Sequence, residues 1–208
     1  MYIAGSQMWF EKVNRLDKKL HGFGCGIVAL HDLCVYRGLV KAPLGRDEFK
    51  KQIRAMEKGG MFVVPRHGIA PYYYHFLCNI FLIRKKIPLR IGWGHGPLYE
   101  NRTGLSGIRK NLEKGFPTIF AVGPTYPFFF KKKYLTLYNT ERKPSGYRTK
   151  AHYMTILDIT ESGGETWLEI ASWGKQFSIK FSELYEFSKM TVPLTTRFYS
   201  VREKRRNT

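Results

Sequence analysis

The stretch Gly22–Leu30 (GFGCGIVAL) places one cysteine, Cys25, between glycines at the start of an apolar-periodic run. The periodicity continues through Leu33 and Cys34 and predicts a buried helix from Gly24 to Tyr36. A helix N-terminus carries unpaired N–H groups and the positive end of the helix dipole, and both stabilise a thiolate. The small Gly24 beside Cys25 leaves room for another backbone to approach the sulfur and is expected to line a cleft.

The first half of the chain is predicted to be helix and loop. Further helices are expected over 47–58, 70–84 and 107–114, and the segment 90–107 is expected to be mostly loop. The second half contains short apolar or alternating runs separated by turn residues. It predicts strands over 116–123, 151–159, 166–173, 176–181 and 197–201, an edge strand or hairpin loop over 127–138, and a short helix over 182–187.

This order of elements is typical of an α+β fold in a single domain spanning residues 1–208. The expected parts are a mainly helical half (1–115), a mainly antiparallel β half (116–201) and a basic tail (202–208). A hydrophobic content of 43% and an aromatic content of 15% argue against a disordered chain.

The charge balance is strongly basic, with 35 Lys and Arg against 16 Asp and Glu and a net charge of +19. Such a surface attracts polyanions or acidic partners, although the charges are spread along the whole chain and predict no specific nucleic acid. Three cysteines without a CxxC pair or a Cys/His cluster do not indicate a structural metal site.

No membrane span or secretion signal is predicted. The apolar run from Pro71 to Ile83 contains His75 and Asn79, ends in Arg84–Lys86, and is too short to cross a bilayer. The N-terminus lacks a basic stretch followed by an apolar core, so a cytoplasmic protein is the expectation. The sequence predicts no oligomeric state.

A cysteine nucleophile needs a base in reach and a group that orients the base. Among the six histidines, His152 opens a predicted strand, where sites are often built. If the next turn is centred near residues 162–163, positions whose numbers sum to about 324–327 face each other. His152 then lies beside Ser172 and Trp173, so Ser172 could accept the imidazole N–H and Trp173 could shield that bond from water. Cys34 and Cys78 are expected to be core cysteines.

These residues resemble papain-like cysteine peptidases in order and spacing. The features are Gly-Cys-Gly at a helix start, a histidine opening a late strand, and Ser172-Trp173-Gly174 at the end of the next strand. The short chain is most similar to the branch of bacteriocin-processing peptidases that cleave double-glycine leaders. Within it, the chain resembles uncharacterised bacterial proteins that carry the segments read here as Gly5–Phe10 (GSQMWF) and Ser172–Lys175 (SWGK).

The resemblance implies a papain-like fold whose nucleophile helix packs on the antiparallel sheet. It also implies that Cys25 is the nucleophile, His152 the base and Gln7 the oxyanion-hole donor, with no cofactor or metal and with a peptide or protein substrate. The positive charge of the chain makes an acidic substrate a candidate. Two positions depart from the family pattern. Lys19 stands where the family glutamine usually lies, and Ala171 stands where an orienting asparagine is usual, which leaves Ser172 or a backbone carbonyl to orient His152.

Two alternatives remain open at this point. The first is a papain-like fold that has lost catalysis and binds a polyanion or acidic partner through its basic aromatic surface, for which Phe128–Lys133 is a candidate. The second is a related acyl-transfer enzyme, such as an amidase or a transglutaminase-like protein. The aromatic, basic regions 71–99 and 124–138 are expected to flank the cleft.

Overall fold

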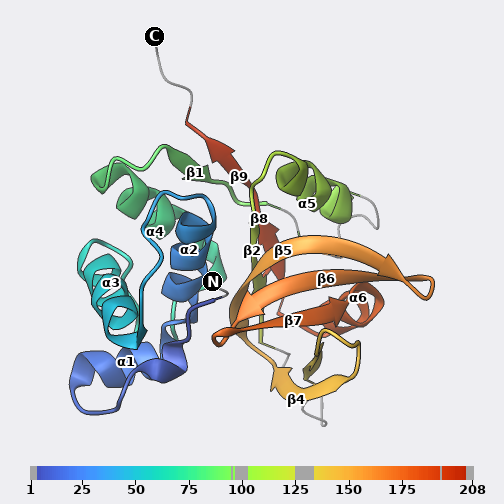
Figure 1. Cartoon of the computed structure of the whole chain (residues 1–208), viewed down its shortest axis with the longest axis horizontal. Coiled ribbons are helices and arrows are strands. Elements are labelled where there is room, and N and C mark those ends of the chain that lie inside the picture. Colours follow the sequence, from blue (N-terminus) through green and yellow to red (C-terminus); the bar gives the residue numbers. More distant parts are fainter. Residues whose placement is uncertain (1–3, 95, 97–102, 125–133, 193, 205–208) are drawn as a thin grey trace.

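Helices occupy the first part of the chain and an antiparallel sheet occupies the second (Figure 1). The computed structural model describes residues 4–94, 96, 103–124, 134–192 and 194–204. The first part contains η1 (Gln7–Trp9), α1 (Arg15–Phe23), α2 (Cys25–Tyr36), α3 (Arg46–Lys58), α4 (Pro71–Arg84), β1 (Leu89–Ile91) and α5 (Thr103–Glu113). The second contains β2 (Thr118–Val122), β3 (Leu135–Tyr138), β4 (Pro144–Thr149), β5 (His152–Ser162), β6 (Glu165–Ser172), β7 (Lys175–Lys180), α6 (Phe181–Ser188), β8 (Arg197–Tyr199) and β9 (Val201–Glu203). The expected α+β class is confirmed.

The sheet has two buried faces. Its strand order is β4-β3-β7-β6-β5-β2-β8, and all its neighbours pair antiparallel. In β2, Ile119 and Ala121 belong to the core shared with α1–α4, whereas Phe120 and Val122 belong to the core shared with α5 and α6. Because both faces are covered, β2 appears in the sequence as a continuous apolar run rather than an alternating one.

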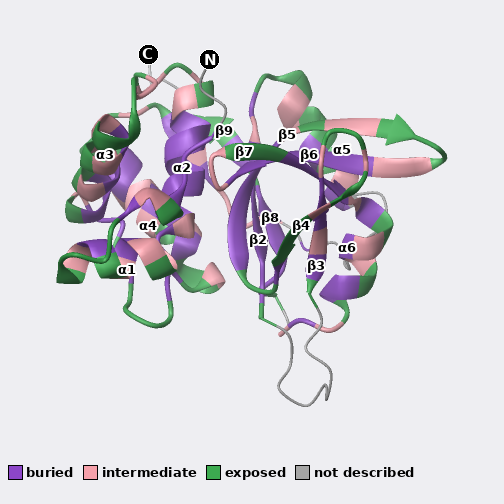
Figure 2. Cartoon of the chain, turned by 60° about the horizontal axis from the view of Figure 1, so that its bottom comes forward, coloured by how far each residue is buried: buried purple, intermediate pink, exposed green. Residues whose placement is uncertain are grey.

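Helix α2 lies at the centre of the helical part and is buried from Gly26 to Cys34 (Figure 2). A helix that is apolar on nearly all sides must be covered on nearly all sides. The Thr155 hydroxyl of β5 donates to the Ala29 carbonyl at 3.2 Å, and the Tyr74 hydroxyl of α4 donates to the Gly26 carbonyl at 2.8 Å. Helix α2 is therefore fixed between the sheet and α4.

The register of the β5–β6 hairpin agrees with the sequence-based expectation. Thr155 faces Ala171 and Ile156 faces Ile170. The register shifts between Ile156 and Asp158, so Leu157 forms a bulge. Because of this bulge Asp158 does not share the buried face of Met154 and Ile156, and its side chain is exposed.

The sequence pattern does not predict several short or polar elements correctly. Helix α1 is largely polar, and its position is fixed by an ion pair in which Arg54 of α3 donates two hydrogen bonds to Asp17, at 2.9 and 2.7 Å. The β1–β9 pair is three residues long and occupies parts of the expected loop and basic tail, with Leu89 facing Glu203. Strand β4 was not predicted, and α5 starts at Thr103 rather than at residue 107.

Cys34 and Cys78 are fully buried free thiols, as expected for core cysteines. Within the described residues, no helix is both long and apolar enough to cross a membrane.

Candidate functional site

The residues singled out in the sequence meet at one small cavity. Gln7 of η1, Cys25 at the start of α2, His152 at the start of β5 and Ser172 at the end of β6 all line it, together with Trp173. The cavity measures about 10 Å³, room for roughly one water molecule. Gly24 is not among the lining residues. It joins α1 to α2, and a Cβ there would lie 2.5 Å from the Leu20 carbonyl oxygen.

Two effects act in opposite directions on the pKa of the Cys25 thiol. Burial raises its pKa above the usual value, and hydrogen bonds from the backbone N–H groups of Tyr153, Gly26 and Cys25 itself act in the opposite direction. Burial prevails, so the resting group is a thiol. The stabilisation expected from the helix N-terminus is present, but it does not lower the pKa overall.

The ring of His152 is held on two sides. Its Nε2 lies 2.7 Å from the Oγ of Ser172, and its face stacks on the ring of Trp173 with centroids 4.3 Å apart. His152 is 6% exposed, and this burial lowers its pKa to about 3, so the ring is neutral near pH 7. Among the described residues, no hydrogen bond joins this ring to the sulfur of Cys25.

A tight turn presents Trp173 to His152. Strands β6 and β7 are joined by Trp173 and Gly174, with Ser172 facing Lys175. Trp173 has φ 47° and Gly174 has φ 75°, the left-handed pair that a two-residue hairpin turn requires. An aromatic residue rarely adopts this conformation, and here it turns the indole onto the imidazole.

The N-terminal segment forms hydrogen bonds with two walls of the cavity, α2 and the turn between β6 and β7. The Gly5 N–H donates to the carboxylate of Asp32 on α2 at 3.0 Å, and the Gly174 N–H donates to the Gly5 carbonyl at 2.9 Å. Gln7 follows two residues later and is 9% exposed. Helix α1 lies in the interval between Gln7 and Cys25 and is joined to α3 by the ion pair between Asp17 and Arg54.

Asp32 is a lining residue that the sequence analysis missed. It is 1% exposed, and it anchors Gly5 through both carboxylate oxygens. The available signal was an acidic residue in the middle of a largely apolar helix, because such a group is buried only when it has hydrogen-bond partners.

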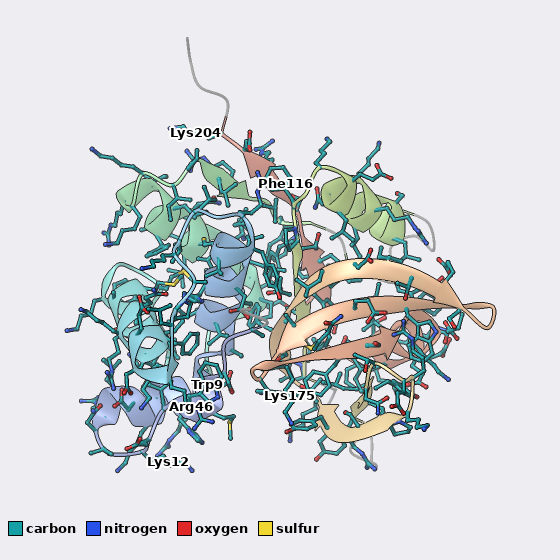
Figure 3. The ribbon with its side chains drawn as sticks, in the orientation of Figure 1. Trp9, Lys12, Arg46, Phe116, Lys175 and Lys204 are labelled. Carbon is teal, nitrogen blue, oxygen red and sulfur yellow. The ribbon has the colours of Figure 1, made fainter. Side chains whose placement is uncertain are left out.

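Cationic and aromatic side chains lie around the cavity. The Arg46 guanidinium lies 5.8 Å from the centre of the Trp9 ring, and the Lys175 ammonium lies 5.0 Å from the centre of the Tyr147 ring. Figure 3 places Trp9, Arg46 and Lys175 at the same end of the molecule. Tyr147 in turn stacks on Trp173.

The regions expected to flank the cleft do not line this cavity where the structure describes them. Helix α4 packs on α2 through the hydrogen bond from Tyr74 to Gly26, and β7 and β6 separate β3 from β5, so no described residue of α4 or β3 reaches the cavity. Phe128–Lys133, the candidate polyanion surface, falls outside the described residues. Across the described ranges, no group of three or more His, Cys, Asp or Glu side chains is placed to hold a metal ion.

Comparison with known proteins gives no match to any family model, to any curated protein or to any solved structure.

Proposed function

We propose that the chain is a papain-like thiol hydrolase, most simply a peptidase, with Cys25 as nucleophile and His152 as base. The observation that carries the proposal is the convergence on one cavity of Gln7, Cys25, His152 and Ser172, which are widely separated in the sequence. A nucleophile, a base, a group that orients the base and an amide donor are the parts that acyl transfer needs.

The placement of the two reacting groups supports the papain-like arrangement. Cys25 begins a central helix that packs on the sheet, and His152 begins the β5 strand on which that helix packs. With its proton on Nε2, the His152 ring donates to Ser172 and leaves Nδ1 available as a base. Ser172 thus takes the place that Ala171 cannot fill.

The reaction follows from these roles. As the sulfur of Cys25 attacks the substrate carbonyl, its proton passes to His152, and the oxyanion is held by the Cys25 N–H and the Gln7 side-chain amide. The C–N bond then breaks, and His152 gives its proton to the leaving amine. Water, deprotonated by His152, attacks the thioester and releases the acid and the free thiol. No residue changes oxidation state in the cycle.

The resting pair is neutral rather than an ion pair, because burial disfavours both the thiolate and the imidazolium. A substrate must also widen a cavity of about 10 Å³. Substrate entry and proton transfer are therefore coupled, and the free enzyme is expected to react slowly with small electrophiles. Arg46 and Lys175 at the same end of the molecule favour acidic peptides.

A second candidate is a basic binding module that keeps this fold without turnover. The neutral pair and the lack of a hydrogen bond between Cys25 and His152, both described residues, favour it. It predicts binding to acidic peptides without their cleavage.

Incubation with a defined library of acidic, neutral and basic peptides distinguishes the two candidates. New N-termini are mapped by mass spectrometry for the wild type and for Cys25→Ala, which removes the sulfur and little volume. We expect cleavage by the wild type alone. Binding of acidic peptides by both proteins without new N-termini supports the binding module instead.

A further inference from the structure

Helix α4 has two apolar faces, and the described residues bury one of them and leave most of the other exposed. Tyr74, Cys78, Phe81 and Leu82 are buried against the core. On the opposite side, Tyr73, Phe76 and Ile83 are 66%, 59% and 54% exposed, and Tyr72 is 40% exposed. At 3.6 residues per turn, Tyr72, Tyr73, Phe76, Ile80 and Ile83 fall within about 100° of arc, so they form one continuous face.

The loop before α4 packs against the outer side of this helix and carries two further exposed apolar residues. A Cβ at Gly60 would lie 3.3 Å from Ile80 and 3.1 Å from the Arg84 guanidinium, which places the loop against the outer side of α4. Phe62 and Val64, which follow in the same loop, are 56% and 53% exposed. We call the exposed residues Phe62, Val64, Tyr72, Tyr73, Phe76 and Ile83 the α4 face. Figure 2 shows exposed and intermediate residues along α4.

The part of the sequence that contains the α4 face has basic residues and no acidic ones. The stretch from Lys58 to Tyr99 contains no Asp or Glu. Its Lys58, Arg66, Arg84, Lys85 and Lys86 are all exposed. The preceding acid, Glu57, is largely buried and pairs with Lys19 of α1. Any partner of this surface must therefore accept both apolar side chains and several cations that pair with no acid among the described residues.

We propose that the α4 face docks on an anionic lipid surface. Aromatic and aliphatic side chains inserted at the acyl boundary, with Lys and Arg at the headgroups, are the pattern of helices that lie in a membrane interface. Helix α4 has 14 residues and is about 21 Å long, too short to span the hydrocarbon layer but long enough to lie along it.

A single-stranded nucleic acid would use the same cations but fits the apolar residues less well. Bases stack on aromatic rings, whereas Val64 and Ile83 offer no ring for stacking. A second copy of the chain would bring the same excess of cations to the interface. The charge complement therefore favours lipid over self-association.

The test is sedimentation of the full chain with vesicles of phosphatidylcholine alone or mixed equally with phosphatidylglycerol. We expect binding to the mixed vesicles alone, weakened by added salt. Phe76→Ser/Ile83→Ser should weaken it at least tenfold, because two apolar side chains no longer insert. Lys85→Glu/Lys86→Glu should also weaken it at least tenfold.

Matched controls separate the α4 face from general hydrophobicity and net charge. Val13→Ser/Leu44→Ser removes two exposed apolar side chains elsewhere, and Lys18→Glu/Lys51→Glu makes the same change in net charge on α1 and α3. Both controls should bind like the wild type and have unchanged melting temperatures.

Three results would overturn the proposal. The first is that wild-type protein does not bind mixed vesicles, and the second is that the controls lose as much binding as the α4-face variants. The third is that Phe76→Ser/Ile83→Ser abolishes a dimer or the binding of a single-stranded oligonucleotide while leaving vesicle binding intact. None of these outcomes depends on turnover at Cys25.

Discussion

The Oγ of Ser172 lies 2.7 Å from the Nε2 of His152, and both residues are buried beside the sulfur-bearing Cys25. The preceding Ala171 has no polar side-chain atom and pairs with Thr155 within the sheet. In the proposed mechanism the hydroxyl therefore fixes the tautomer and orientation of the ring, and Trp173 covers the bond.

Ser172→Ala should leave a buried ring nitrogen without a partner. We expect about 1–3 kcal/mol lower unfolding free energy and a decrease in turnover of order 10²-fold, since the base is no longer held in place. Urea unfolding and peptide cleavage measure the two effects. Ser182→Ala, which removes an exposed hydroxyl bonded to Glu165, is the control. Unchanged turnover in Ser172→Ala would show that Ser172 does not position His152.

The pattern of the sequence predicts the long elements well and the short ones poorly. Helix α2 and the β5–β6 hairpin have strong periodicity and a clear turn, so their positions and register could be predicted. Helix α1 depends on the ion pair between Asp17 and Arg54, a tertiary contact that no local pattern reveals. The β1–β9 pair is too short to show alternation.

The same contrast between local pattern and tertiary contact applies to the candidate site. Spacing alone predicts that Ser172 and Trp173 lie beside His152, because hairpin register is set by local turn geometry. The approach of Gln7 and the burial of Asp32 depend on how the N-terminal segment crosses between α2 and the β6–β7 turn. Burial also reverses the expected direction of the Cys25 pKa, an effect that requires the packed structure.

The pH dependence of stability should report the burial of neutral His152. The folded pKa of about 3 lies below the usual value of 6.5, so the unfolded chain binds a proton that the folded chain does not. Above pH 6.5 the ring is neutral in both the folded and the unfolded chain, and this group does not lower the free energy of unfolding. As the pH falls from 6.5 toward 3, the unfolded chain takes up the proton, and the free energy of unfolding decreases by up to about 1.4 kcal/mol per pH unit.

Urea titrations from pH 7 to pH 4 measure this slope. In His152→Gln the slope should be smaller than in the wild type, because the titrating group is gone. Identical slopes in the two proteins would mean that His152 is protonated as readily when folded as when unfolded.

Gly174→Ala tests the turn that presents Trp173. The new Cβ would sit at φ 75° and lie 2.8 Å from the Trp9 ring, so it adds a clash to the backbone strain. Gly163→Ala is the matched control, because it also has a positive φ, of 60°, with nothing within 4 Å. We expect Gly163→Ala to cost about 1 kcal/mol of unfolding free energy and Gly174→Ala clearly more, together with lower turnover. Equal losses would show that contact with Trp9 is unimportant.

Gln7→Ala separates oxyanion stabilisation from thiol reactivity. Acyl transfer develops a negative oxygen, whereas alkylation by iodoacetamide does not. The variant should lose about 10²–10³-fold in turnover and label Cys25 at least as fast as the wild type, because the shorter side chain widens the cavity. Peptide cleavage and adduct mapping by mass spectrometry give the two rates. A parallel fall in both rates would indicate that Gln7 acts on the structure around Cys25 rather than on the oxyanion.

The most direct test of the central claim is the rate at which p-nitrophenyl acetate acylates Cys25, followed by nitrophenolate release and by the mass of the acetylated chain. The account predicts a single acetyl group on Cys25 in the wild type, none at this position in Cys25→Ala, and acylation slowed by at least about 10²-fold in His152→Ala, which lacks the base. Equal acylation rates in the wild type and in folded His152→Ala would contradict the pairing of Cys25 with His152.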